Sequence, residues 1–450
     1  MQLHIMTAVA VSFALCVTPT AQDSFPGFER TDIVRPAGAY TVLASGDILS
    51  FNGTAVERQT ADGLSVATIA VPATMDFPNV FTSFLTVSPD ETTALVGRTG
   101  CNSDFSNCNF GDVWWVDLVN LTAQAHDDLP NNFDGALASS TTGYVSVKSC
   151  GFGCPTAEVV RVELGAPGFV DEVSYVGASG PIALAPSGDL VIGTVSNDFP
   201  PPAAGSEVYR FSAGDLGGAT VLTEADGELV ATGLIGAAAM QFDAATGDLF
   251  LLANRYQTTP QNEDITENLL YLIEPQGDVE VLFEGELGWT LGNLVVTPSN
   301  GVARLFRYQP AEGGRFSFRG TNYTTFASTD REYAPRRPEL EVTSTGSTAT
   351  VTVAGGGAGN VGLVFYRPAG SVLSPEVPVT LGGLSHAPWF FGLDPTVAVI
   401  DFGAIVFDAN GDGAKSYAIP PTTPPATFAA QLMVLEGAVT PIGTSNVAIL

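Results

Sequence analysis

The clearest candidate for metal chemistry is the run DANGDG near the C-terminus. It places Asp408, Asn410 and Asp412 at alternate positions with Gly413 behind them, and oxygen ligands in this order form the first half of an EF-hand-like calcium loop. The twelfth position of such a loop is Ile419, where the motif requires a bidentate acid. Two interpretations follow, a calcium site and a strand-connecting turn, and the missing acid favours the turn.

Histidine-based and phosphate-based chemistry have little support. Beyond the N-terminal leader only His126 and His386 remain, and no G-x-S-x-G motif occurs, so a serine hydrolase is disfavoured. Residues 357–362, GAGNVG, match G-x-G-x-x-G, but the strand-like run LVFYRP follows where phosphate binding needs a helix N-terminus. We interpret this stretch as a hairpin turn, and the sequence predicts no catalytic residue.

The cysteines form two local pairs. Cys101 lies near Cys108, and Cys150 lies near Cys154; Cys16 falls in the leader. An even count suits an oxidising compartment, so we expect two short-range disulfides. A zinc site is the competing interpretation, but the spacings do not match zinc knuckles and no histidine is adjacent.

The composition narrows the class of partner. The chain has 450 residues, with 47 acidic against 17 basic residues and a formal net charge of −30. Such a charge repels phosphate backbones, so nucleic acid and anionic membrane surfaces are poor partners. The 49 glycines, 30 prolines and low content of charged residues favour many short strands. We expect an all-β protein.

The N-terminus predicts export. Residues 1–21 contain an apolar run from Ile5 to Val17 and end in a small-residue cleavage site, as in a secretory signal peptide, although no Lys or Arg precedes the run. A lipid anchor at Cys16 is disfavoured because Leu15 stands where a small residue is needed. We expect an extracellular, periplasmic or cell-surface protein without a transmembrane segment.

A strand–turn–strand phrase recurs every 45 to 60 residues. Its copies begin at Thr41, Thr86, Ala136, Ala183, Gln241 and Val295. Each reads as a β-hairpin, and a further strand follows most copies, which gives about four strands per repeat. Small sheets repeated in this way are stabilised by radial stacking, so we predict a β-propeller over residues 22–335. Six blades are expected, with a degenerate seventh as the alternative, and FERTDIVRP is expected to close the ring.

Long loops join the second and third strands of four successive repeats, and both cysteine pairs belong to them. Because equivalent connections emerge on one face of a propeller, we expect these loops to lie side by side. The predicted ligand-binding residues are Asp104, Phe105, Phe110, Phe152, Asp198 and Tyr256. Disulfides order such loops before a ligand arrives, which favours recognition. Protection from proteases is the competing interpretation.

The phrases SPDETTALVG and APSGDLVIG resemble those of secreted bacterial propellers of the lactonase-like and TolB-like kind. Lactonases of the gluconolactonase type hold a divalent metal in the central channel, so the resemblance implies a metal-dependent hydrolase as one alternative. Asp90, Asp189 and Asp248 lie in the repeat turns, where aspartate is a good turn residue, and we do not interpret them as ligands.

The remainder of the chain is predicted to form a second domain. After YAPRRPEL the propeller phrase stops, and at least seven short strands follow, so a β-sandwich is expected over residues 336–450. The ending resembles a C-terminal β-domain of exported bacterial proteins. This resemblance implies that ATFAAQLMVLEG forms a strand, although its residues could also form a helix.

Seven of the 17 basic residues cluster in the last blade and the linker, namely Arg304, Arg307, Arg315, Arg319, Arg331, Arg336 and Arg337. They predict either an anion site or pairing with the protein's own acids where the two domains meet, and the second is favoured.

The sequence therefore favours an exported, monomeric, non-enzymatic binding or surface-associated protein. Its predicted ligand is a glycan or a protein on the long-loop face. The alternative is the metal-dependent hydrolase acting in the central channel.

Overall fold

The computed structural model describes most of the chain as β-strands. The described residues are 28–72, 77–103, 108–126, 129–148, 155–197, 204–244, 247–258, 263–285, 289–297, 315–322, 325, 327–335, 339–345, 347–356, 360–379, 389–393, 401–408, 411–418, 428–436, 440–444 and 448–449. The predicted signal peptide, residues 1–21, lies outside them. Within these ranges no helix is long and apolar enough to cross a membrane.

The strands from β2 to β25 follow one another in antiparallel groups of four, and the second and third groups are joined into one sheet where Leu129 and Pro130 pair with Gly111 and Phe110. The first two groups are β2 (Ala39–Val42), β3 (Ile48–Phe51), β4 (Ala55–Gln59), β5 (Ser65–Ala70), and β6 (Asn79–Val87), β7 (Thr93–Cys101), β8 (Phe110–Asp117), β9 (Thr122–Ala125). The next two are β10 (Leu129–Leu137), β11 (Thr142–Lys148), β12 (Thr156–Glu163), β13 (Val170–Val176), and β14 (Ile182–Leu184), β15 (Leu190–Gly193), β16 (Ser206–Phe211), β18 (Glu228–Leu234). A short strand, β17 (Leu222–Thr223), adds to β13 in parallel.

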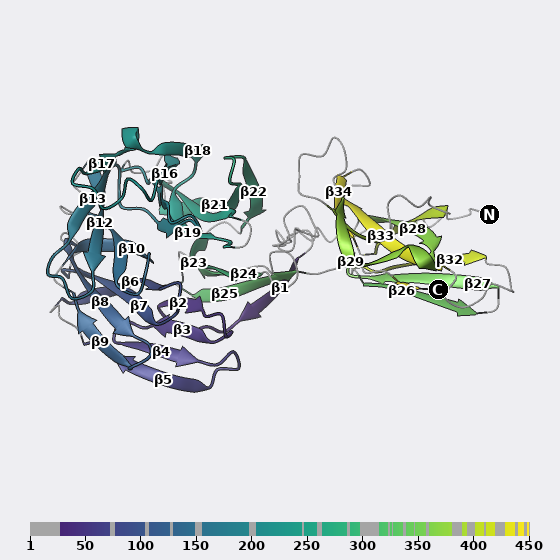
Figure 1. Cartoon of the computed structure of the whole chain (residues 1–450), viewed down its shortest axis with the longest axis horizontal. Helices are drawn as coiled ribbons and strands as arrows, with labels where there is room; N and C mark the ends of the chain where they lie inside the picture. The colour runs from purple at the N-terminus through teal and green to yellow at the C-terminus, as the bar shows by residue number, and fades with distance from the viewer. Residues whose placement is uncertain are drawn as a thin grey trace, which may run out of the picture.

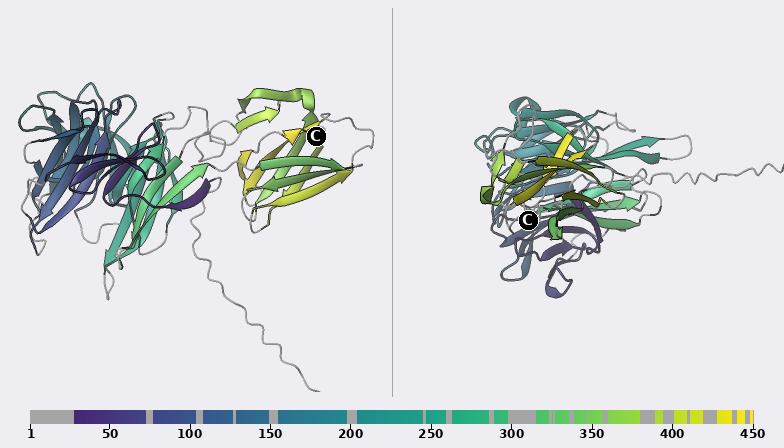
Figure 2. Two further views of the ribbon diagram at one scale, coloured as in Figure 1. Left: turned by 90° about the horizontal axis from the view of Figure 1, so that it is seen from below. Right: turned by 90° about the vertical axis from the view of Figure 1, so that its right-hand side faces the viewer.

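The last two groups bring the two ends of the ring together. They are β19 (Ala237–Phe242), β20 (Leu249–Thr258), β21 (Glu263–Ile273), β22 (Val279–Glu284), and β23 (Trp289–Thr297), β24 (Arg315–Asn322), β25 (Ser328–Pro335), β1 (Phe28–Ile33). The N-terminal strand β1 pairs antiparallel with β25 (Figure 2), which confirms that FERTDIVRP supplies a closing strand. The segment TNYTTFASTDREYA, residues 321–334, contributes to β24 and β25 of the sixth group.

The chain is a β-propeller (Figure 1). Its innermost strands contact one another in cyclic order, β2, β6, β10, β14, β19, β23 and back to β2. Strands inside the groups, such as β7 and β8, are almost continuously buried, because neighbouring groups cover both faces of each sheet. The outer strand β5 is mostly exposed.

Glycines set the recurrent turns between first and second strands. Gly46, Gly188 and Gly247 have φ of 86°, 88° and 76°, a conformation that other residues adopt only with strain. Gly46 N donates to Leu43 O and Gly188 N donates to Ala185 O, so these turns have the same local geometry. The SGD-type phrases in the sequence therefore specify the hairpins.

Strands β26 to β35 form a separate group of sheets. One sheet contains β26 (Glu339–Thr345), β27 (Thr348–Ala354) and β32 (Gly413–Ala418). Another contains β31 (Asp401–Val406), β28 (Val361–Pro368), β33 (Phe428–Glu436), β34 (Thr440–Thr444) and β35 (Ala448–Ile449), and β29 (Val372–Val379) pairs with β30 (Trp389–Leu393). Leu340 and Val351 share a core with Val364 and Leu432. ATFAAQLMVLEG supplies strand β33, and LVFYRP lies in strand β28, as predicted. The hairpin turn predicted at GAGNVG is wrong, because β27 and β28 belong to different sheets and do not pair.

Candidate functional site

The disulfide predicted between Cys101 and Cys108 is present. Cys101 ends β7, Cys108 lies just before β8, and both side chains are buried. The disulfide therefore closes the base of the loop between the second and third strands of its group. The predicted binding residues Asp104 and Phe105 lie inside this loop, outside the described residues.

A buried ion pair lies directly below the disulfide. Arg98 and Asp112 face each other across β7 and β8 and are 1% and 2% exposed. The guanidinium donates from Nε to Asp112 Oδ1 at 2.8 Å and from Nη2 to Oδ2 at 2.5 Å. This two-point geometry is the strongest that arginine makes with a carboxylate.

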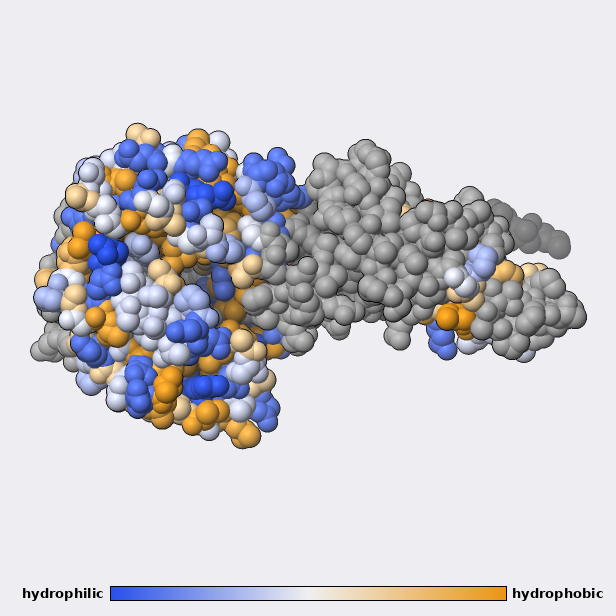
Figure 3. All heavy atoms as spheres, viewed as in Figure 1, coloured by the Kyte–Doolittle hydropathy of each residue, from blue (hydrophilic) through white to orange (hydrophobic). Residues whose placement is uncertain are grey.

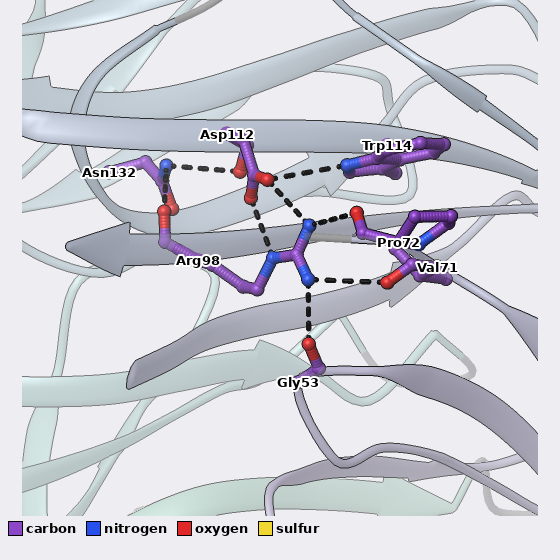
Figure 4. Close-up of polar contacts among 7 residues, drawn as sticks. All are labelled: Gly53, Val71, Pro72, Arg98, Asp112, Trp114 and Asn132. Carbon is purple, nitrogen blue, oxygen red and sulfur yellow. Dashed lines mark hydrogen bonds and ion pairs between the residues drawn. The ribbon is translucent and has the colours of Figure 1, made fainter. Parts of the chain in front are cut away.

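Arg98 also joins its group to the preceding one (Figure 4). Its Nη1 donates to Gly53 O at 2.7 Å and Val71 O at 3.2 Å, and its Nη2 donates to Pro72 O at 2.8 Å. A buried charge is tolerated when its hydrogen-bonding capacity is filled, and here a carboxylate and three carbonyls fill it.

Asn132 extends this connection to the following group. From β10 its Nδ2 donates to Arg98 O at 2.9 Å and Asp112 O at 3.4 Å. A Cβ at Gly111 would collide with the Asn132 side chain, so glycine is needed there for the close approach. Three successive groups are thus locked together beneath the disulfide loop.

Above this base lies a polar network that borders the central channel. Ser83 Oγ lies 3.1 Å from Thr99 Oγ1, and the Thr99 hydroxyl is within donating distance of Asn131 Oδ1 at 3.0 Å and Asn132 O at 2.8 Å. All four residues line the channel. Their amide and hydroxyl groups offer both donors and acceptors to a ligand.

Exposed apolar side chains lie at the same strand ends as the network, with Phe81 on the same face of the sheet as Thr99 and Phe110 on the other face. Phe81, Phe110 and Phe133 are 48%, 45% and 37% exposed, and Val80 is 39% exposed. The Phe110 ring stacks on Phe77 with centroids 4.8 Å apart. Across the sheet, Val80, Gly100 and Phe110 occupy one register row. We call Val80, Phe81, Thr99, Phe110, Asn131 and Phe133 the loop-edge surface.

The other predicted binding residues are not brought to this surface by described structure. Phe152 and Asp198 lie outside the described residues, as do Cys150 and Cys154. Tyr256 lies in β20, where its backbone pairs with Ile265. The side-by-side arrangement of the long loops stays a prediction.

The DANGDG run forms a tight turn in the part of it that is described. Asp408 Oδ1 accepts from Asp412 N at 3.0 Å, and Asp412 Oδ1 accepts from Gly355 N at 3.2 Å. Asn410 lies outside the described residues. These hydrogen bonds are those of a turn, and calcium binding stays a prediction. Among the described residues, no cluster of three His, Cys, Asp or Glu side chains could hold a metal ion.

The central channel has a volume of about 980 Å³, and Figure 3 shows the propeller hollowed at its centre. Among the described residues that line it, Glu91 and Asp134 are the carboxylates. Glu91 Oε1 accepts from Ala44 N at 2.6 Å in a turn. Asp90 likewise caps its own turn, accepting from Ser88 and Thr92, which lowers its pKa.

Asp134 is the unusual acid of the channel. Its carboxylate accepts from Gly135 N at 2.8 Å and from Ile182 N at 3.0 Å, so it connects β10 to β14 of the next group. Burial raises its pKa from 3.8 to about 7, and the two backbone hydrogen bonds only partly offset that effect. The group is therefore poised to change charge near neutral pH.

Asp134→Asn is expected to flatten the pH dependence of stability. The folded protein binds more protons at Asp134 than the unfolded chain between pH 3.8 and about 7, so the wild type loses stability as the pH rises through that window. Relative to the variant, this loss of stability should be about 2 kcal/mol, less than the full pKa shift implies, because Asp134 is partly exposed to the channel. Denaturant unfolding of both proteins at pH 4.5 and pH 8 measures it, and parallel changes in the two would contradict the assignment.

The arginine cluster is explained in part by internal pairing. Arg319 donates from Nε to Asp330 Oδ1 at 2.9 Å and from its Nη atoms to Gly38 O and Pro36 O. Arg331 is buried. Arg319 therefore pairs with an acid of the protein itself, but within the propeller and not where the two domains meet. Arg304, Arg307, Arg336 and Arg337 lie outside the described residues, and the side chain of Arg315 is not described.

No family model matches the sequence, and no curated protein matches it. The solved structures that resemble it do so distantly. Soluble aldose sugar dehydrogenase from Escherichia coli shares 10% identity, with 69% of this chain and 100% of that chain covered and a TM-score of 0.44. A protein of unknown function from Dyadobacter fermentans shares 8% identity, with 69% and 100% covered and a TM-score of 0.45. Trypanosoma rangeli sialidase shares 11% identity, with 94% and 92% covered and a TM-score of 0.42.

Proposed function

We propose that this protein is an exported, non-enzymatic binding protein whose loop-edge surface recognises a carbohydrate. The observation that carries the proposal is the set of exposed rings, Phe81, Phe110 and Phe133, beside the Thr99–Asn131 polar network. In this proposal residues 1–21 direct export, residues 22–335 form a six-bladed propeller, and residues 336–450 form a β-sandwich that provides attachment or spacing.

A carbohydrate matches this chemistry because a sugar ring has both apolar C–H faces and hydroxyl groups. Exposed aromatic rings pack against apolar faces, and amides and hydroxyls pair with polar edges. The buried Arg98–Asp112 pair holds the underlying strands, so little ordering is required when a ligand binds. The formal charge of −30 favours a neutral or cationic glycan over an acidic one.

The metal-dependent hydrolase that the sequence left open has less support. Hydrolysis on a divalent metal needs several oxygen ligands around one position. Among the described channel residues, Glu91 is engaged in a turn and Asp134 accepts two backbone N–H groups. This donor set offers no convergent group of carboxylates.

Phe110→Ala and Phe81→Ala should each weaken glycan binding about tenfold, because each removes a stacking surface worth about 1.4 kcal/mol. A glycan array followed by titration calorimetry with the best neutral glycan measures this effect. Phe169→Ala is the matched control, since Phe169 is 41% exposed but follows β12 in the connection to β13, at the opposite strand ends.

Two outcomes would count against the proposal. Equal glycan affinities for all three variants would place the site elsewhere. If the loop-edge surface binds a protein but no glycan, the ligand would be a protein. Reduction of the Cys101–Cys108 disulfide, verified by mass spectrometry, should also weaken binding.

A further inference from the structure

Lys148 lies in an unusual position for a lysine. It is one of two lysines in the chain, it ends strand β11, and its side chain is 3% exposed. Its Nζ lies 2.5 Å from Asn197 Oδ1 and 3.2 Å from Gly177 O. Asn197 follows strand β15 of the next group, so the contact joins two neighbouring sheets of the propeller.

The environment makes the ammonium ion less favourable than it is for a lysine in water. Burial lowers the pKa of Lys148, and the charge of Glu158 acts in the opposite direction. A desolvated lysine is a stronger nucleophile than an exposed one, since more of it carries a free lone pair at neutral pH. Lys415, which is exposed, has no comparable setting.

The carboxamide of Asn197 is held on its other side. Its Nδ2 donates to Pro155 O at 3.1 Å, while its Oδ1 faces the lysine. Lys148 Nζ therefore contacts the carbonyl group whose carbon, Cγ, it would attack. Glu158, on the adjacent strand β12, is the nearby carboxylate whose charge acts on Lys148.

We propose that Lys148 and Asn197 join spontaneously to form an intramolecular isopeptide bond. The neutral Lys148 amine attacks Asn197 Cγ, the Nζ–Cγ bond forms, and the Cγ–Nδ2 bond breaks. One Nζ proton passes to the departing nitrogen, which leaves as ammonia, and Glu158 carries that proton. No oxidant, reductant or further reactant is needed. The product ties the β11 group covalently to the β15 group, independently of any ligand.

Peptide mapping of the full-length purified protein tests the proposal. Trypsin digestion is expected to yield a branched peptide in which the segments containing Lys148 and Asn197 are joined, with the mass of both minus one ammonia. Cleavage after Lys148 should be lost. Mapping also excludes ammonia lost from an unrelated asparagine or glutamine, which an intact mass alone would not distinguish.

Three variants define the outcome. Lys148→Arg and Asn197→Ala should yield no branched peptide, and Glu158→Gln should yield far less of it while its melting temperature stays within a few degrees of that of Lys148→Arg. A wild-type map that contains only linear peptides, with trypsin cleaving after Lys148, would overturn the proposal and leave the contact as a hydrogen bond. A branched peptide of undiminished yield in Glu158→Gln would overturn the role of Glu158.

Discussion

Replacing Arg98 with alanine is expected to lower the free energy of unfolding by about 3–5 kcal/mol, the usual cost of leaving one partner of a buried ion pair alone. Asp112 would stay 2% exposed without its guanidinium, and the carbonyls of Gly53, Val71 and Pro72 would lose their donor. Asp112→Asn should also be destabilising, by leaving the guanidinium uncompensated. Denaturant unfolding monitored by tryptophan fluorescence measures both.

The matched control is Arg58→Ala in the neighbouring group. Arg58 pairs with Asp47 at 2.6 Å, but its side chain is 36% exposed, so water replaces the lost partner and the cost should be within about 1 kcal/mol. Similar losses in Arg98→Ala and Arg58→Ala would show that burial of the Arg98 pair has no special role.

A second comparison separates stability from binding. The double variant Arg98→Met with Asp112→Leu removes both charges and should regain part of the lost stability, because an apolar replacement of a buried pair is close to neutral. The double variant still lacks the guanidinium that donates hydrogen bonds to the backbone carbonyls of the preceding group. The strand ends that form the loop-edge surface should therefore be less ordered. We expect its glycan affinity to stay below that of the wild type.

Much of the fold was predictable because the signals are local. A glycine or aspartate in a turn between two apolar runs sets a hairpin within about ten residues, and the left-handed glycines at Gly46, Gly188 and Gly247 lie in those turns. The closing strand was also predictable. FERTDIVRP has the residue pattern of a strand, and the sequence next to it offers no strand with which it could form a hairpin.

The ion pair beneath the disulfide was not predicted, because it depends on register across a loop. Arg98 and Asp112 are 14 residues apart, and nothing local indicates that they face each other. The usable signal was the repeat. Arg255 faces Glu267 and Arg319 faces Asp330 in the same position, the end of a second strand against the start of a third. Aligning the repeats by strand, and not by their turns, would have shown this basic–acidic pairing.

Of the aromatic residues in the loop-edge surface, one was predicted from the sequence and two were not. Phe110 was predicted because it flanks the disulfide loop, whereas Phe81 and Phe133 lie in first strands, which are not adjacent in sequence to any of the long loops. They lie at the same strand ends as Phe110 only after β6, β7, β8 and β10 are assembled. A surface made by tertiary packing of first and third strands has no contiguous sequence signature.

Deleting residues 1–33, and with them β1, is expected to lower the melting temperature by about 10–20 °C. Each residue from Phe28 to Ile33 pairs with β25, and Arg35, which follows, donates to Glu332 at 3.2 Å. Loss of the strand's hydrogen bonds at about 1 kcal/mol each gives a loss near 5 kcal/mol, and about 2–4 °C accompanies each kcal/mol in a domain of this size. The deletion also leaves β25 as an open edge, which promotes association between chains.

The control deletion removes residues 1–27 and keeps β1, and its melting temperature should match that of the protein that lacks residues 1–21. Thermal unfolding with size-exclusion chromatography distinguishes the two deletions, and a synthetic FERTDIVRP peptide added in trans should restore part of the stability of the longer one. Equal melting temperatures for both deletions would mean that contacts between β2 and β23 alone hold the ring closed, and β1 would then be only a surface strand. The antiparallel register of all six residues argues against that outcome, because a strand paired along its whole length cannot be removed without exposing its partner's backbone groups.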